Sequence, residues 1–206
     1  MKKLTSILFA VIFSCMVHAQ ETSKLTVFPD FRPAIAHLTD GRTLTLPFAN
    51  IFLKNGSLLY KSGTQTMQAN MKNIVSVDFA ERQYIKIDTL LAHAIDSVGQ
   101  NRIYQATLVD IEAYKAMLRN NTDITSLSLG DNFSYSTVGP NSDDERTMPL
   151  VNQFYFLYNG KMLRVHERVL WHELPKEKRR AFKTIISLPT FSWSDPNSLK
   201  QLLSVM

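Results

Sequence analysis

The sequence predicts an α+β fold whose N-terminal part is rich in antiparallel strands, arranged as a small barrel or a sandwich, and whose C-terminal part contains helices. Alternating apolar and polar residues recur about every ten residues in the first half. Turn dipeptides separate these segments, and helical spacing of apolar residues begins only near residue 110. Strands first and helices last are typical of an α+β chain.

The first 19 residues have the three parts of an export signal. Lys2 and Lys3 are followed by the apolar stretch 4–13 and by small residues that end at Ala19. The apolar stretch is too short for a stable membrane span. We therefore expect a signal peptide over 1–19, cleaved before Gln20, and a periplasmic or secreted protein with no transmembrane span in its mature chain.

Cys15 offers an alternative fate for this signal, because cleavage before a cysteine would produce a lipoprotein anchored through that residue. Phe13 is bulky where a lipoprotein signal usually has a small residue, and Met16 and Val17 continue the apolar stretch. These neighbours favour cleavage after Ala19.

The mature chain of 187 residues has 21 basic and 18 acidic residues, a net charge of +3. This small excess does not indicate a nucleic-acid partner. Loss of Cys15, the one cysteine, leaves no disulfide, thiol nucleophile or thiolate metal site. We expect no cofactor, and stability that comes from an apolar core.

Residues 20–108 form the expected β-rich module. Asp40-Gly41 and Asn55-Gly56 each lie between alternating segments, and such dipeptides favour hairpin turns because they tolerate positive φ. The segments 74–79 and 84–87 continue the alternation. Several short strands at this spacing favour a barrel or a sandwich.

Residues 109–206 form an expected α+β module, with one continuous domain as the alternative. Asp110 is a suitable N-cap for a helix that begins at Ile111. Further hairpins are expected at Gly130-Asp131 and Asn159-Gly160, and the polar segment 139–149 is expected to be a loop.

Two helices are expected to end the chain. Pro175 is suited to the first position of a helix through Ser187, and Pro189 would close it. Asp195 would cap a last helix with Pro196 as its first residue.

The motifs of common enzymes and metal sites are missing from the sequence. His166 and His172 lie six residues apart, which points them about 120° away from each other on a helix, so they do not suit a helical zinc pair. The chain has no G-x-S-x-G motif, no glycine-rich phosphate loop and no calcium-loop spacing. We predict no catalytic residue and no metal ligand.

A basic stripe is the candidate binding feature. Lys176, Arg180 and Lys183 follow the spacing i, i+4, i+7, with apolar residues on the opposite side of the expected helix. This face would contact an anionic glycan, an anionic lipid surface, or an acidic envelope or extracellular protein. A solvated helix face explains the same pattern.

Trp171 and Trp193 flank this helix in the sequence. We include Trp171 with the candidate binding residues, since an aromatic side chain beside basic residues can bind a sugar. Both tryptophans also suit a second role, in which they anchor the helices to the sheet.

The last 50 or so residues resemble the C-terminal part of a group of uncharacterised exported bacterial envelope proteins, in which a strand module is followed by a helical unit. Most of the matching positions suit packing; they are Leu174, Pro175, Lys178, Phe182, Ile185, Phe191, Leu199, Leu202 and Leu203. Leu174 stands where the group has Phe. The resemblance implies export and architecture, and supplies no catalytic residue.

The function that we expect is that of a non-catalytic binding, adaptor or structural protein of the bacterial envelope. A cofactor-free hydrolase of envelope or extracellular polymers is one alternative. A peptide-binding sensor or inhibitor that uses an exposed strand edge is another.

Overall fold

The computed structural model describes residues 21–22, 25–120 and 148–206. The expected signal peptide 1–19, Cys15 and the expected hairpin at Gly130-Asp131 lie outside the described residues. Of the expected loop 139–149, only its last two residues are described, and both belong to a strand.

The described residues consist mainly of antiparallel strands, together with a few helices, which confirms the predicted α+β class. The strands are β1 (Glu21–Thr22), β2 (Arg32–Leu38), β3 (Thr43–Phe52), β4 (Ser57–Ser62), β5 (Gln65–Gln68), β6 (Ile74–Phe79), β7 (Arg82–Ile87), β8 (Leu90–Val98), β9 (Asn101–Val109), β10 (Met148–Tyr158) and β11 (Lys161–Arg164). The helical elements are η1 (Met71–Asn73), α1 (Ile111–Asn120), α2 (Glu167–Glu173), η2 (Lys176–Lys178), α3 (Arg179–Ile186) and α4 (Pro196–Val205).

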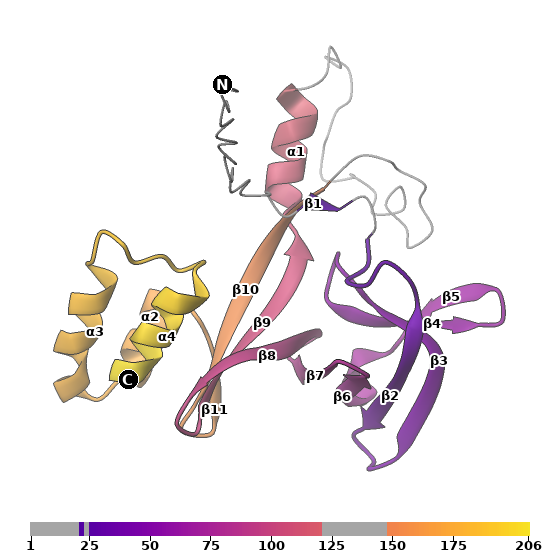
Figure 1. The fold of residues 1–206 in the computed structure, drawn as a ribbon, viewed down its shortest axis with the longest axis horizontal. Helices are drawn as coiled ribbons and strands as arrows, with labels where there is room; N and C mark the ends of the chain where they lie inside the picture. Colours follow the sequence, from indigo (N-terminus) through magenta and orange to yellow (C-terminus); the bar gives the residue numbers. More distant parts are fainter. Residues whose placement is uncertain (1–20, 23–24, 121–147) are drawn as a thin grey trace, which may run out of the picture.

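All strand pairs are antiparallel and belong to one curled sheet with the order β1-β10-β9-β8-β7-β6-β2-β3-β4-β5, in which β11 pairs with β10. The first strands curl into a half-barrel, and the long strands β8, β9 and β10 run from it to the C-terminal helices (Figure 1). Of the two expected arrangements, the small barrel is the closer one. The expected module boundary at 108/109 falls at the end of β9, which pairs with β10 across it.

The turn between β3 and β4 partly closes the half-barrel. The Gly56 carbonyl accepts a hydrogen bond of 2.8 Å from the Leu91 amide at the start of β8, and the Leu53 carbonyl accepts one of 2.8 Å from the Val109 amide. Gly56 has a φ of +70°, and a Cβ added there would lie 2.5 Å from the Leu90 Cβ. Only glycine fits this close approach.

The predicted hairpin turns within the described residues lie at the dipeptides that the sequence indicates, but only at Asn159-Gly160 do both residues have positive φ. Asn159 and Gly160 both have positive φ, 49° and 78°, as a two-residue hairpin requires. At Asp40-Gly41 and at Asn55-Gly56 only the glycine has positive φ, and the second of these turns spans residues 53–56. The Asn55 side chain instead accepts a hydrogen bond of 3.1 Å from the Ser57 amide, an Asx turn that stabilises this longer loop.

Asn50 fixes the segment before β2 to the barrel. Its side chain is fully buried, and its Oδ1 accepts hydrogen bonds from the amides of Phe28 (3.0 Å) and Ile51 (2.9 Å). Its Nδ2 donates to the carbonyls of Phe28 (2.9 Å) and Asp30 (3.3 Å). A buried amide that satisfies four partners ties two chain segments together.

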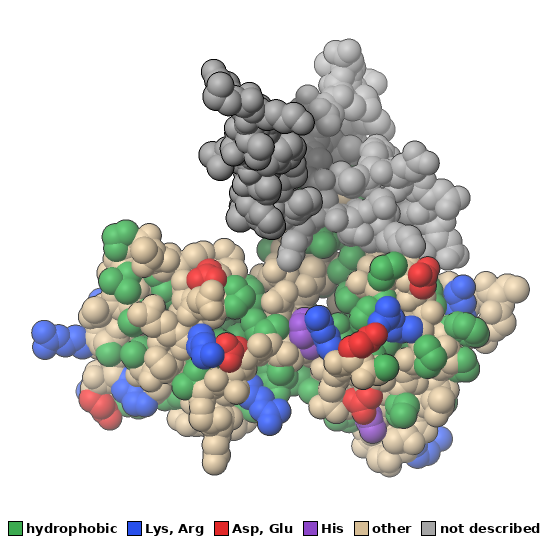
Figure 2. All heavy atoms as spheres, viewed as in Figure 1, with side chains coloured by type: hydrophobic (Ala, Val, Ile, Leu, Met, Phe, Trp, Pro, Cys, Tyr) green, Lys and Arg blue, Asp and Glu red, His purple; other side chains and the backbone are tan. Residues whose placement is uncertain are grey.

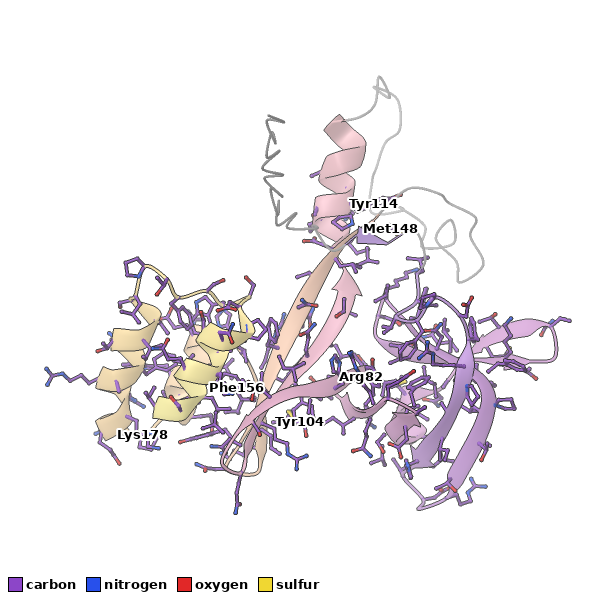
Figure 3. The ribbon with its side chains drawn as sticks, in the orientation of Figure 1. Arg82, Tyr104, Tyr114, Met148, Phe156 and Lys178 are labelled. Atoms are coloured by element: carbon purple, nitrogen blue, oxygen red, sulfur yellow. The ribbon has the colours of Figure 1, made fainter. Side chains whose placement is uncertain are left out.

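The C-terminal helices cover one face of β9 and β10. Phe154, Phe156 and Tyr158 alternate along β10 and point into this core. They pack with buried side chains from each helix, among them Leu170, Phe182, Leu199, Leu202 and Leu203. Figure 3 labels Phe156 between the strands and the helices.

Two predicted caps are confirmed. The Asp110 carboxylate accepts a hydrogen bond of 2.9 Å from the Ala113 amide at the start of α1. Asp195 accepts one of 2.9 Å from the Ser198 amide and caps α4, with Pro196 as its first residue. Short side chains that satisfy free amides at helix starts explain both.

The helix expected from Pro175 is different in the structure. Pro175 is extended (ψ 149°), a 3₁₀ turn follows at Lys176–Lys178, and α3 begins at Arg179. An additional helix, α2, precedes them, so the chain ends in three α-helices and not two. α2 ends at Glu173 because Leu174, the residue before a proline, is held extended.

Candidate anion-binding groove

α2 and α3 position the candidate site, and Trp171 lies where they meet. The His166 Nδ1 accepts a hydrogen bond of 3.3 Å from the Arg168 amide and caps α2. Leu170 of α2 and Phe182 of α3 are fully buried. Their burial holds the outer faces of both helices in a fixed relation.

The Trp171 ring is half-buried and has two kinds of neighbours. On the protein side its centroid lies 6.1 Å from that of Phe182, which lies 6.5 Å from that of Trp193. Toward solvent, the Arg179 guanidinium carbon lies 5.1 Å and the Lys183 ammonium nitrogen 5.0 Å from the Trp171 centroid. These distances are in the range of cation–π contacts.

Two open hollows adjoin at Trp171 and Lys183, which line both. One, of about 520 Å³, is also lined by His166, Glu167 and Arg168. The other, of about 680 Å³, is also lined by Arg179, Arg180, Thr184, Ser187 and Leu188. We call the two together the Trp171 groove.

The charge of the Trp171 groove is strongly positive. Four basic side chains line it, and Glu167 is the one acidic residue among its lining. Within the described residues, Arg168, Arg180 and Lys183 form no ion pair with a carboxylate. Their charges are therefore available to an anionic ligand, at a surface where an indole can stack on a ring.

Three of the four sequence-predicted site residues come together here, namely Trp171, Arg180 and Lys183. Lys176 lies in η2 and lines neither hollow. The expected i, i+4, i+7 stripe needs one continuous helix from Lys176, but α3 begins three residues later. Trp193 has the packing role, since its ring meets that of Phe191 edge-on at 4.8 Å.

Sequence reasoning missed Arg168 and Arg179. Arg168 precedes Trp171 by three residues on α2, and Arg179 precedes Lys183 by four on α3. Such spacings place side chains on the same helix face. Arg168 was missed because α2 was not expected to be a helix, whereas Arg179 lay within the expected helix but outside the predicted stripe.

Lys178, one of the positions that match the exported envelope proteins, does not line the groove. Its ammonium donates to the main-chain oxygen of Met206, which also accepts a hydrogen bond of 2.6 Å from the Tyr158 hydroxyl. Figure 3 labels Lys178 at the end of the helical lobe. The residue therefore contributes to packing of the lobe.

In the part of the chain that the structure describes, no three histidine, cysteine or acidic side chains are grouped to hold a metal ion. Nor does any helix of the described ranges have the length and apolar character to cross a membrane.

Comparisons of the chain with protein families, curated proteins and solved structures give no significant match, so the resemblance of its C-terminal segment to exported bacterial envelope proteins stays a prediction.

Proposed function

We propose that this chain is an exported, non-catalytic binding protein of the bacterial envelope and that its Trp171 groove holds an anionic polysaccharide. The observation that carries the proposal is the position of Trp171 between two adjoining hollows, beside Arg179 and Lys183. The export signal expected over residues 1–19 supports the location.

The shape and charge of the groove support a polymer with repeated negative charges. Adjoining hollows that share Trp171 suit consecutive units of one chain, since one sugar ring can stack on the indole while its neighbours extend to either side. Arg168 lies in one hollow and Arg180 in the other, so each end offers a guanidinium for a carboxylate or sulfate.

The groove offers less support for hydrolysis. The Thr184 hydroxyl donates to the Arg180 carbonyl of its own helix (3.0 Å), and the His166 Nδ1 caps α2. Neither is placed as a nucleophile paired with a base. The hydrolase therefore stays a prediction, as does the strand-edge sensor or inhibitor, for which β5 at the end of the sheet would be the edge.

Trp171 can report binding directly, because the chain has two tryptophans. In a Trp193→Phe background the packing ring is kept and Trp171 is the one indole that emits. We expect polygalacturonate to change this emission at low salt and neutral dextran to leave it unchanged. Raising the salt to about 0.3 M should weaken the response, since exposed charges are screened.

The matched variants separate the groove from general basic charge. Arg180→Gln with Lys183→Gln should weaken polygalacturonate binding about tenfold, because each exposed charge pair contributes up to about 1 kcal/mol. Lys176→Gln, on a basic residue outside the groove, should bind as the parent does. No response of Trp171 to polygalacturonate would refute the glycan ligand, and binding only to anionic lipid vesicles would replace it with a membrane surface.

A further inference from the structure

A second polar cluster lies on the half-barrel, where β7 and β8 leave it toward the C-terminal lobe. It contains Arg32 of β2, Glu81 between β6 and β7, Arg82 and Tyr84 of β7, and His93 of β8. Figure 3 labels Arg82 at this place, and Figure 2 shows basic, acidic and histidine side chains close together on this face of the half-barrel. These residues share no member with the Trp171 groove.

Hydrogen bonds and ring contacts hold the side chains of the cluster in place. Arg32 Nη1 donates to both Glu81 carboxylate oxygens, at 2.7 and 2.8 Å, and its guanidinium carbon lies 4.1 Å from the Phe28 centroid. The Arg82 Nη1 lies 3.4 Å from the His93 Nε2. Tyr84 lies among them, with its ring 6.2 Å from Phe28 and 5.2 Å from His93.

Two hydrogen-bond donors in this cluster are buried without an acceptor. Within the described residues, the Arg32 Nε and the Tyr84 hydroxyl are the two buried side-chain polar atoms that have no partner. The Tyr84 side chain is deeply buried, with 3% of the residue exposed. Arg82 lies near its hydroxyl but not in hydrogen-bond geometry. Buried donors are nearly always satisfied, so an acceptor is missing at this place.

The protonation of His93 is fixed by its neighbours. Because Arg82 is a donor only, the His93 Nε2 must accept from it, which requires a neutral imidazole. Burial, and next the Arg82 charge, lower the pKa of His93 below its usual value. The cluster therefore has two guanidinium charges and one carboxylate charge, a net charge of +1.

We propose that Arg32, Arg82 and Tyr84 form a binding site for the carboxylate group of a small organic acid. Such a group would accept hydrogen bonds from the Arg32 Nε and the Tyr84 hydroxyl and from the Arg82 guanidinium. Its single negative charge matches the net charge of the cluster, whereas a phosphate dianion does not. The Arg82 side chain is exposed, so it can move to admit the ligand while the barrel stays folded.

The test uses sodium acetate as the probe, at pH 7.5 and constant ionic strength with sodium chloride as the replacement salt. The protein is the chain as processed by the producing cell. Two-dimensional NMR of the arginine side-chain Nε–H groups follows Arg32, assigned with an Arg32→Lys variant. A small ligand binds weakly, so the titration extends to about 100 mM. We expect a saturable shift of the Arg32 Nε–H signal.

Tyr84→Phe is the decisive variant, because it removes the buried hydroxyl that has no hydrogen-bond partner and keeps the aromatic ring. Loss of a hydrogen bond to a charged group should weaken acetate binding about tenfold or more. The same change should not lower stability in chloride, since an unsatisfied buried hydroxyl contributes none. Arg42→Gln, on an exposed arginine of the same barrel, should leave acetate binding unchanged.

Three results would overturn this site. They are no shift of the Arg32 signal up to the highest acetate concentration, equal acetate binding by the parent and Tyr84→Phe, and sulfate or phosphate binding as tight as that of acetate. None of them affects the Trp171 groove, because the two sites share no residue.

Discussion

Replacement of Gly56 by alanine should break the partial closure of the half-barrel. Gly56 has a φ of +70°, and an added Cβ would lie 2.5 Å from the Leu90 Cβ and 3.2 Å from the Leu90 Cα. The residue cannot move away easily. Its amide donates to the Phe52 carbonyl at 2.7 Å and its carbonyl accepts from Leu91 at 2.8 Å.

The expected loss of stability has two parts. A left-handed backbone costs an alanine about 1–2 kcal/mol. Carbon atoms pack best at about 3.5–4.0 Å, so the contact with Leu90 adds the cost of overpacking, about 1–3 kcal/mol. Together they lower the free energy of unfolding by about 2–5 kcal/mol, a large share of the 5–15 kcal/mol typical of a domain.

Gly41→Ala is the matched control. Gly41 has a φ of +80° and no atom within 4 Å of an added Cβ, so this change carries the backbone cost alone. Urea unfolding, followed by circular dichroism, measures both variants against the parent. A loss for Gly56→Ala no larger than that for Gly41→Ala would refute the steric argument and the importance of the Gly56–Leu91 contact.

Two further predictions concern buried polar groups of the barrel. Asn50→Ala should lower the free energy of unfolding by about 3 kcal/mol, because it removes the hydrogen bonds of this buried side chain to main-chain groups of residues 28 and 51. A loss below about 1 kcal/mol in urea unfolding would contradict this role. His93 has a lowered pKa in the folded chain, so the unfolded chain binds its proton first as the pH falls. The stability from neutral His93 is therefore complete above the unfolded pKa of about 6.5 and is lost as the pH falls from there toward the folded value. Urea titrations at several pH values measure how the free energy of unfolding depends on pH in the parent and in His93→Gln. The variant should lack this part of the pH dependence. The same change in free energy between pH 7.5 and 5 in both proteins would argue against it.

The strands and caps could be predicted because they depend on near neighbours. The Asn159-Gly160 turn requires two residues that tolerate positive φ, and the Asp195-Pro196 start requires a cap and a preset φ. The helix α2 was not predicted, although its N-cap, His166, directly precedes it in the sequence. Histidine is rarely an N-cap, so it does not indicate the start of a helix. Because α2 was not predicted, Arg168 was not recognised as a candidate groove residue.

The candidate sites differ in how much of them the sequence revealed. Trp171, Arg180 and Lys183 lie within 13 residues of each other, so helical spacing in the sequence was enough to predict these three groove residues. Arg32, Arg82 and His93 belong to three strands, and no spacing relates them. Only strand pairing in the curled sheet places them together.

The amino-acid sequence was enough to predict the α+β class, the positions of the described hairpin turns and the two confirmed helix caps, because each follows from the conformational preferences of residues within about four positions. Three features depend on the three-dimensional fold: the close approach of Gly56 to Leu90, the position of Lys178 outside the groove, and the two donors without an acceptor at Arg32 and Tyr84. These depend on how the sheet curls and how the helices lie on it, and the burial that drives such packing has no direction along the chain.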